Sequence, residues 1–184
     1  VVESNRPGAM GGTAPHAEFW LFRTGDAGTE YPDEEQNWAV AAEFADSAGA
    51  DMISSSLGYA EFGDPTFNHT YPQRNGNTTL ITLAADLAAK KGMIVMNSAG
   101  NSGALATEYK YVSCPADGDS VMTVGATDIN GNIAAFSSWG PNGAGKTTLM
   151  DAITGRRKPT RGRVFVHGVD ITALSVEARR RGGM

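Results

Sequence analysis

Residues 140–148 form the densest group of chemically capable residues in the sequence. They read Gly-Pro-Asn-Gly-Ala-Gly-Lys-Thr-Thr, which fits the pattern G-x-x-x-x-G-K-[ST]. Glycines in such a loop let backbone N–H groups turn toward phosphate oxygens, while the lysine reaches the terminal phosphates and the following threonine ligates magnesium. A helix that begins there would add the positive end of its dipole. The pattern predicts contact with ATP and Mg²⁺ through Gly140, Asn142, Gly143, Ala144, Gly145, Lys146, Thr147 and Thr148.

Two further polar loops each follow an apolar stretch that is typical of a buried strand. Residues 52–53 lead into the polar residues 54–58, and residues 93–96 lead into residues 97–103. In open α/β sheets, binding sites form just beyond the carboxyl ends of parallel strands. We therefore expect these two loops to lie at the same edge of a sheet.

Helical patterns separate the expected strands. Residues 34–47 carry apolar side chains at helical spacing, after an Asp33–Gln36 capping pattern, and Gly49 should end this helix. A second helix should begin near residues 78–79 and end at Gly92. Its expected buried stripe is Leu80, Leu83, Ala84 and Leu87.

Residues 17–22 and 121–124 also read as strands, and residues 128–132 read as a turn. Strands that alternate with helices indicate an α/β fold with a parallel, doubly wound sheet.

Composition sets limits on the function. Hydrophobic residues make up 41% of the 184 residues, which is enough for a core, and no apolar run reaches the roughly 18 residues that span a bilayer. Cys114 is the single cysteine, and the three histidines (His16, His69 and His167) show no ligand spacing, so we expect no metal site. The start is not a signal peptide, and we expect a piece of a longer chain.

The net charge of −5 conceals a reversal near residue 140. Residues 1–139 contain 6 basic and 17 acidic side chains, a net of −11, whereas residues 140–184 contain 9 basic and 3 acidic side chains, a net of +6. A change of this size indicates two segments of different origin. The basic run at residues 156–163 has no aromatic platform, so we expect a solvated face and no nucleic-acid partner.

Several motifs of the first 140 residues resemble those of the subtilisin-like serine proteases, the subtilases. Gly12-Thr13-Ala14-Pro15-His16-Ala17 resembles the family's G-x-A-P-x-A segment, and residues 51–58 resemble D-V-I-N-x-S-L-G. Residues 93–103 resemble a strand followed by A-A-G-N-x-G. Later matches are Cys114-Pro115-Ala116, residues 121–126 and Phe136-Ser137-Ser138-Trp139-Gly140. Their order and spacing agree with the middle of a subtilase catalytic domain.

This resemblance implies roles for the residues that match. Asn101 would be the oxyanion-hole side chain, whose amide stabilises the negative charge that develops on the attacked carbonyl oxygen. Ser56, Leu57 and Gly58 would pair with an extended peptide or protein substrate through backbone hydrogen bonds. Ser98, Ala99 and Gly100 would line the pocket for the side chain that precedes the cut bond.

The Asp, His and Ser of the catalytic triad find no counterparts in the sequence. The family's Asp and H-G-T motifs would precede Val1, and residues after Gly140 do not resemble its G-T-S-M-A motif. His16 matches a variable family position, and Ser98 lacks a G-x-S-x-G frame. We therefore expect this chain to be inactive as a protease by itself.

The segment from residue 140 resembles the start of an ATP-binding-cassette (ABC) ATPase. Its loop, the helix at residues 149–155 and the strand pair expected in residues 159–171 are closest to the ATP-binding subunits of branched-chain amino acid or urea importers. The signature and hydrolytic motifs of that family would follow Met184, so we expect no ATP hydrolysis.

The sequence thus predicts a partial subtilase-like peptidase domain over residues 1–139 and a partial ABC ATPase segment over residues 140–184. A natural fusion, a misassembly and a designed chimera all remain open. Two alternatives stand beside an inactive protease: a nucleotide-binding module and a non-catalytic peptide-binding domain. The resemblance to subtilases implies secretion or the cell surface, whereas the resemblance to ABC ATPases implies the cytoplasmic face of a membrane. The sequence leaves the location open.

Overall fold

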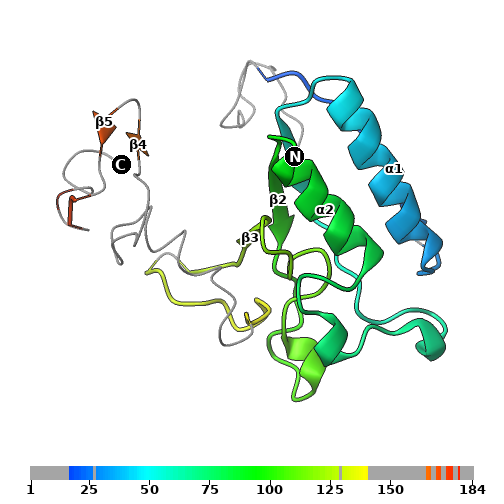
Figure 1. Cartoon of the computed structure of the whole chain (residues 1–184). Coiled ribbons are helices and arrows are strands. Elements are labelled where there is room, and N and C mark those ends of the chain that lie inside the picture. Colours follow the sequence, from blue (N-terminus) through cyan, green and yellow to red (C-terminus); the bar gives the residue numbers. More distant parts are fainter. Residues whose placement is uncertain are drawn as a thin grey trace, which may run out of the picture.

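The computed structural model describes residues 17–26, 28–128, 130–140, 165–166, 169–170, 173–175 and 178 (Figure 1). Among these residues, no helix is both long and apolar enough to cross a bilayer. Helices and strands are, in chain order, α1 (Asp33–Ser47), β1 (Met52–Ser55), α2 (Leu80–Lys90), β2 (Ile94–Ser98), β3 (Met122–Val124), β4 (Phe165–Val166) and β5 (Val169–Asp170). Short 3-10 helices span Pro65–Phe67, Tyr71–Gln73 and Glu108–Lys110.

A three-stranded parallel sheet in the order β1-β2-β3 forms the centre of the described structure. The central strand β2 pairs with β1 from Met52↔Ile94 to Ser55↔Asn97, and with β3 from Met96↔Met122 to Ser98↔Val124. Strands β4 and β5 form a separate antiparallel pair. The sequence correctly predicts an α/β fold built on a parallel sheet.

Helices α1 and α2 lie side by side against one face of this sheet (Figure 1). Side chains alternate along a strand, so Ile53, Ser55, Val95 and Asn97 share a face. Both helices pack on that face, and the core consists of Trp38, Ala42, Ala45, Tyr59, Phe62, Ile81, Ala85, Ala88, Met93, Val95, Cys114 and Val121. A doubly wound sheet would have helices on both faces, whereas the described helices cover one.

The opposite face of the sheet carries apolar side chains that remain accessible. Met52, Ile94 and Val124 are each about half exposed, and Met96 and Met122 pair across the same face. Faces of parallel sheets are usually covered. Here Met52 and Ile94 leave about half of their surface open to solvent.

The first helix forms where the sequence predicts it, but it begins differently. Pro32 is the N-cap residue and makes no side-chain cap hydrogen bond, so the expected cap by Asp33 is wrong. Proline suits a helix start because its fixed φ is already helical. The acidic residues Asp33, Glu34 and Glu35 occupy the first turn, where the helix dipole favours negative charge.

The second helix is rotated relative to its expected orientation. Leu80, Leu83 and Leu87 are about half exposed, so the predicted leucine stripe is wrong. The helix buries Ile81, Thr82, Ala85, Asp86 and Ala88 instead.

Polar contacts of α2 explain this rotation. Thr82 Oγ1 donates a hydrogen bond of 2.6 Å to Asp117 Oδ1. The carboxylate of Asp86 accepts hydrogen bonds from the backbone N–H groups of Asp119 and Ser120. A buried polar group that lacks a partner costs more than an exposed leucine, so these bonds decide which face points inward.

The expected strand at residues 17–22 does not form. This stretch pairs with no strand of the described sheet, and its aromatic rings rest on α1 instead. The ring of Phe44 lies 5.6 Å from that of Trp20 and 5.7 Å from that of Phe22. Aromatic contacts of this kind hold the segment on the outer side of the helix.

The buried thiol of Cys114 provides a test of this packing. Burial, together with the negative charge of Asp117, raises the pKa of Cys114 to about 12. At pH 8 roughly one such thiol in ten thousand is ionised, against about one in four for an ordinary cysteine. We expect Ellman's reagent to react with the native protein at least about a thousandfold more slowly than with the urea-unfolded protein, as followed by absorbance. Equal rates would mean that this core does not form.

Candidate functional site

The two loops predicted to form a site lie side by side at the carboxyl edge of the sheet. Residues 56–58 leave β1 directly after Ser55, and Ser98 ends β2 directly after Asn97. Because Ser55 and Asn97 are register partners, the chain segments that follow them start as neighbours. The structure therefore brings together the predicted substrate residues Ser56, Leu57 and Gly58 with Ser98, Ala99 and Gly100.

The side chain of Asn97 connects these two segments. It is 1% exposed, and its Nδ2 donates hydrogen bonds of 2.9 Å to the carbonyl oxygen of Leu57 and of 2.9 Å to that of Ser98. Sequence reasoning assigned Asn97 no role. Its position between an apolar strand and a polar loop was the available signal, but its partner Leu57 lies 40 residues away in the chain.

The backbone of residues 56–58 presents unused hydrogen-bonding groups. The Leu57 carbonyl points toward Asn97, and successive peptide groups in extended chain alternate in direction. Within the described chain, neither Ser56 nor Gly58 engages its backbone N–H or C=O in a hydrogen bond. Both residues are exposed, so this segment can accept an added strand.

Residues 100–103 form a tight loop fixed by the segment at residues 136–139. Gly100 has φ of +106° and its carbonyl oxygen accepts a 3.0 Å hydrogen bond from the N–H of Ser138. The N–H of Ser102 donates to Ser138 Oγ at 3.1 Å, and the N–H of Gly103 donates to the carbonyl of Phe136 at 2.8 Å.

Asn101 lies between these fixed points. Its side chain is exposed and, among the described residues, it makes no hydrogen bond, so its amide is free to donate to a ligand. The loop is thus rigid at Gly100 and Ser102 and leaves one accessible side-chain donor between them. Its role at an oxyanion stays a prediction.

A serine or threonine hydroxyl bonded to a histidine is absent from the part of the chain that the structure describes. His69 is the histidine in that part, and its Nε2 lies 3.0 Å from Glu35 Oε1. The ring also packs edge-on against Phe62, at 5.2 Å between centroids. The same residues contain no group of His, Cys, Asp and Glu that could hold a metal. His16 lies outside the described residues.

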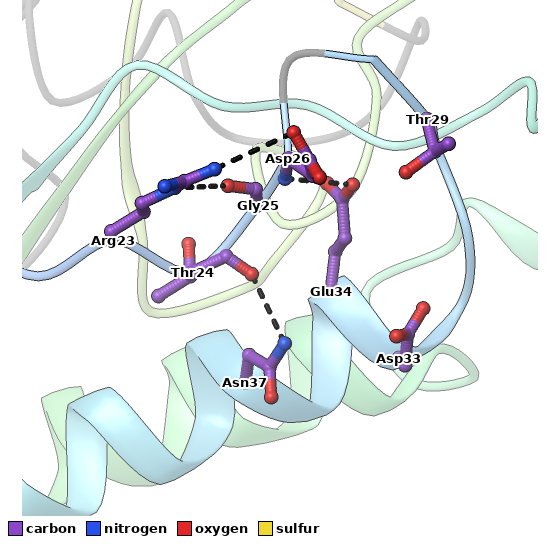
Figure 2. Close-up of a pocket in the computed structure, with 8 residues that line it drawn as sticks. All are labelled: Arg23, Thr24, Gly25, Asp26, Thr29, Asp33, Glu34 and Asn37. Atoms are coloured by element: carbon purple, nitrogen blue, oxygen red, sulfur yellow. Dashed lines mark hydrogen bonds and ion pairs between the residues drawn. The ribbon is translucent and has the colours of Figure 1, made fainter.

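A separate polar hollow of about 440 Å³ lies at the start of α1 (Figure 2). Glu34 lines the hollow, and both of its carboxylate oxygens already accept hydrogen bonds. Oε1 accepts from the N–H of Asp26 at 3.3 Å, and Oε2 accepts from the Tyr59 hydroxyl at 3.1 Å. Burial and the Glu34 bond both raise the pKa of Tyr59, so its hydroxyl stays a donor. The residues that line the hollow are Arg23, Thr24, Gly25, Asp26, Thr29, Asp33, Glu34 and Asn37.

This hollow was not predicted from the sequence. Its contacts join residues that are well separated along the chain, such as Thr24 O and Asn37 Nδ2 at 3.2 Å. Because the side chains of Asp26, Glu34 and Asn37 bond to the protein itself, we interpret the hollow as a structural junction between the segment around Arg23–Asp26 and α1.

Most of the predicted nucleotide-binding residues lie outside the residues that the structure describes. Gly140 is described and exposed. Asn142, Gly143, Ala144, Gly145, Lys146, Thr147 and Thr148 lie outside the described residues, so their phosphate-binding role stays a prediction, as does the domain boundary at residue 140.

Comparison with known proteins identifies the family. A family model described as the subtilase family matches residues 1–159. Subtilisin DY from Bacillus licheniformis is 37% identical over 98 residues, which cover 53% of this chain and 30% of that protein. The chain belongs to the subtilase family.

A shorter similarity concerns ABC proteins. The mycobactin import ATP-binding/permease protein IrtB from Mycolicibacterium thermoresistibile is 46% identical over 65 residues, 34% of this chain and 11% of that protein.

Among solved structures, the prenylagaramide maturation protease PagA has a TM-score of 0.45 at 24% identity, over 58% of this chain and 33% of the other. The chain spans 30% of the length of subtilisin DY and 11% of that of IrtB, which is less than a third of either relative.

A pair of glycines tests how tightly the loop at Gly100 is built. Gly100 and Gly92 both have positive φ, +106° and +112°. A Cβ at Gly100 would lie 2.8 Å from Ser138 Oγ, whereas a Cβ at Gly92 would meet nothing within 4 Å. We expect Gly92→Ala to cost about 1–2 kcal/mol from backbone strain alone, and Gly100→Ala at least about 1 kcal/mol more. Urea unfolding of both variants measures the difference, and equal losses would contradict a close approach of Ser138.

Proposed function

We propose that this chain binds a peptide in extended conformation along the open edge of residues 56–58, beside residues 98–100, without cleaving it. The observation that carries the proposal is the unused backbone of Ser56 and Gly58, which flank a Leu57 carbonyl turned inward to Asn97. Extended peptides add to exposed strand edges through backbone hydrogen bonds of this kind. Membership of the subtilase family supports a peptide as the ligand.

Residues 56–58 form the first wall of the proposed site and residues 98–100 the second. In this proposal, the second wall supplies the specificity for peptide side chains. Ser98 is half-buried and Ala99 is buried with its N–H bonded to the Val124 carbonyl at 2.8 Å, so this wall is fixed to β3. Gly100 completes this wall against Ser138, whose Oγ would lie 2.8 Å from a Cβ at that position. The free amide of Asn101 then donates to a carbonyl oxygen of the bound peptide, where it stabilises developing negative charge in an intact protease.

Cleavage requires more than this donor. A serine attacks a carbonyl only when a base within hydrogen-bond distance takes its proton. In the described residues the single histidine bonds to Glu35, and its ring makes no hydrogen bond to a serine or threonine hydroxyl. A binding groove with an oxyanion donor and no activated nucleophile holds a peptide and leaves its bonds intact.

Peptide titration followed by NMR tests this function. An N-acetylated, C-amidated hexapeptide of alanine and leucine should shift the amide signals of residues 56–58 and 98–101, with a Kd on the order of 1 mM. The matched control is the same peptide N-methylated at alternate residues, which removes the donors and should abolish the shifts. Shifts that appear elsewhere, or equally with the methylated peptide, would contradict the proposal.

The same mixture reports on hydrolysis. We expect the peptide to be recovered intact, and a fluorogenic peptide to release no fluorophore. Release that disappears on Ser98→Ala, or on replacement of another serine of the chain, would show a nucleophile and overturn the inactive assignment.

A second candidate function is the binding of ATP with Mg²⁺ by residues 140–148. The similarity to ABC proteins favours it, because residues 140–148 fit the phosphate-binding loop pattern.

A fluorescent ATP analogue titrated in the presence of Mg²⁺ tests this second function. The wild-type chain should bind it, and Lys146→Ala should weaken binding at least about tenfold, because the lysine places its charge on the terminal phosphates. Lys158→Ala is the matched control, since it removes the same charge outside the loop, and should change little. Equally negligible binding by all three proteins would remove this function.

A further inference from the structure

The pairing of β1 with β2 ends where the proposed groove begins. Main-chain pairing starts with the N–H of Ile94 bonded to the Asp51 carbonyl at 2.9 Å and continues to the register pair Ser55↔Asn97. Just beyond that pair, the Leu57 and Ser98 carbonyls are bonded by the Asn97 side chain instead of by the opposite backbone. The amide thus stands at the point where the strands separate.

One nitrogen atom fixes both carbonyl groups. A primary amide has two N–H groups, so Nδ2 can give one to each carbonyl oxygen, and both distances are 2.9 Å. This arrangement sets the distance between the two oxygens, and with it the distance between the two chain segments. An apolar side chain of the same size could fill the space but could not hold the carbonyls.

The first wall, residues 56–58, depends on the Asn97 contact more than the second wall, residues 98–100, does. At its far end Tyr59 is tied to Cys114, by N–H to carbonyl bonds of 2.8 Å and 3.0 Å. Between Ser55 and Tyr59, the described structure gives the backbone of residues 56–58 a single hydrogen bond, the one from Asn97. The second wall keeps its bonds to Val124 and Ser138.

The burial of Asn97 supports a specific role. Its Oδ1 is buried and, within the described structure, has no hydrogen-bond partner. Leaving such an atom unpaired costs free energy that an apolar residue would avoid. The two hydrogen bonds that Nδ2 donates to the Leu57 and Ser98 carbonyls offset that cost.

We infer that Asn97 is a positioning residue that sets the separation of the two groove walls and thereby the affinity for an extended peptide. This inference rests on the proposed peptide-binding function. It concerns a residue that touches no ligand itself and acts through Leu57 and Ser98. Fixed walls favour binding because the groove does not have to be ordered when the peptide arrives.

Two variants and a matched control test the inference by peptide titration. Asn97→Leu keeps the size and removes both donors, and Asn97→Ser is the smaller replacement should the leucine variant fail to fold. Both should weaken binding of the blocked hexapeptide at least about tenfold. Ser55→Ala is the control: Ser55 is the buried register partner of Asn97, and its Oγ accepts from Trp38 Nε1 at 3.2 Å. It should lose comparable stability and keep its affinity within about twofold.

A readout that needs neither variant nor peptide is the solvent exchange of the Asn97 side-chain amide protons in the full chain. They should exchange at least about tenfold more slowly than those of the exposed Asn77, because both Nδ2 protons of Asn97 are hydrogen-bonded and buried. Exchange as fast as that of Asn77 would overturn the inference.

The outcomes separate the inference from the function beneath it. If the wild-type protein binds and the Asn97 variants bind equally well, or no worse than Ser55→Ala, the positioning role is wrong while the peptide-binding function stands. If the wild-type protein binds no hexapeptide, the proposed function fails, and the role of Asn97 in affinity fails with it. Slow amide exchange would then show that the contact exists as a structural one.

Discussion

The parallel pairing of β2 with both of its neighbours is the constraint on which the rest of the structure depends. Because side chains alternate along β2, Val95 and Asn97 point toward the helices, while Ile94 and Met96 point to the other face. The same register places the ends of β1 and β2 beside each other. One strand therefore determines the core on one side and the spacing of the candidate groove at its end.

Polar contacts, more than apolar ones, decide how α2 is oriented on this sheet. Asp117 accepts hydrogen bonds from Thr82 Oγ1 and from the N–H of Gly76 at 2.9 Å, and so ties the helix to the loop before it. Asp86 ties the same helix to the turn before β3. Leucines were free to face outward because small residues such as Ala85 let α2 approach its neighbours closely.

Patterns along the chain predict what local physics controls. The helix at residues 33–47, the strands around residues 53, 95 and 123, and the adjacency of the two polar loops follow from periodicity and from the geometry of parallel sheets. The buried face of α2 and the contacts of Asn97 depend on partners 35 and 40 residues away, which no local pattern encodes. Residues 17–22 have the composition of a strand, but Phe44 offers their aromatic rings an alternative contact.

Peptide recognition and peptide cleavage place different demands on a chain of this family. In the proposed function, recognition would use backbone groups of residues 56–58 and the buried amide of Asn97, which bonds to the Leu57 and Ser98 carbonyls. Cleavage needs an acid, a base and a nucleophile held within hydrogen-bond distance of one another. In the described residues, the His69 ring bonds to Glu35 and to no serine or threonine hydroxyl. The geometry proposed to hold a peptide thus lies at one edge of the sheet, where the ends of β1 and β2 meet, and it does not require the geometry that would break a peptide bond.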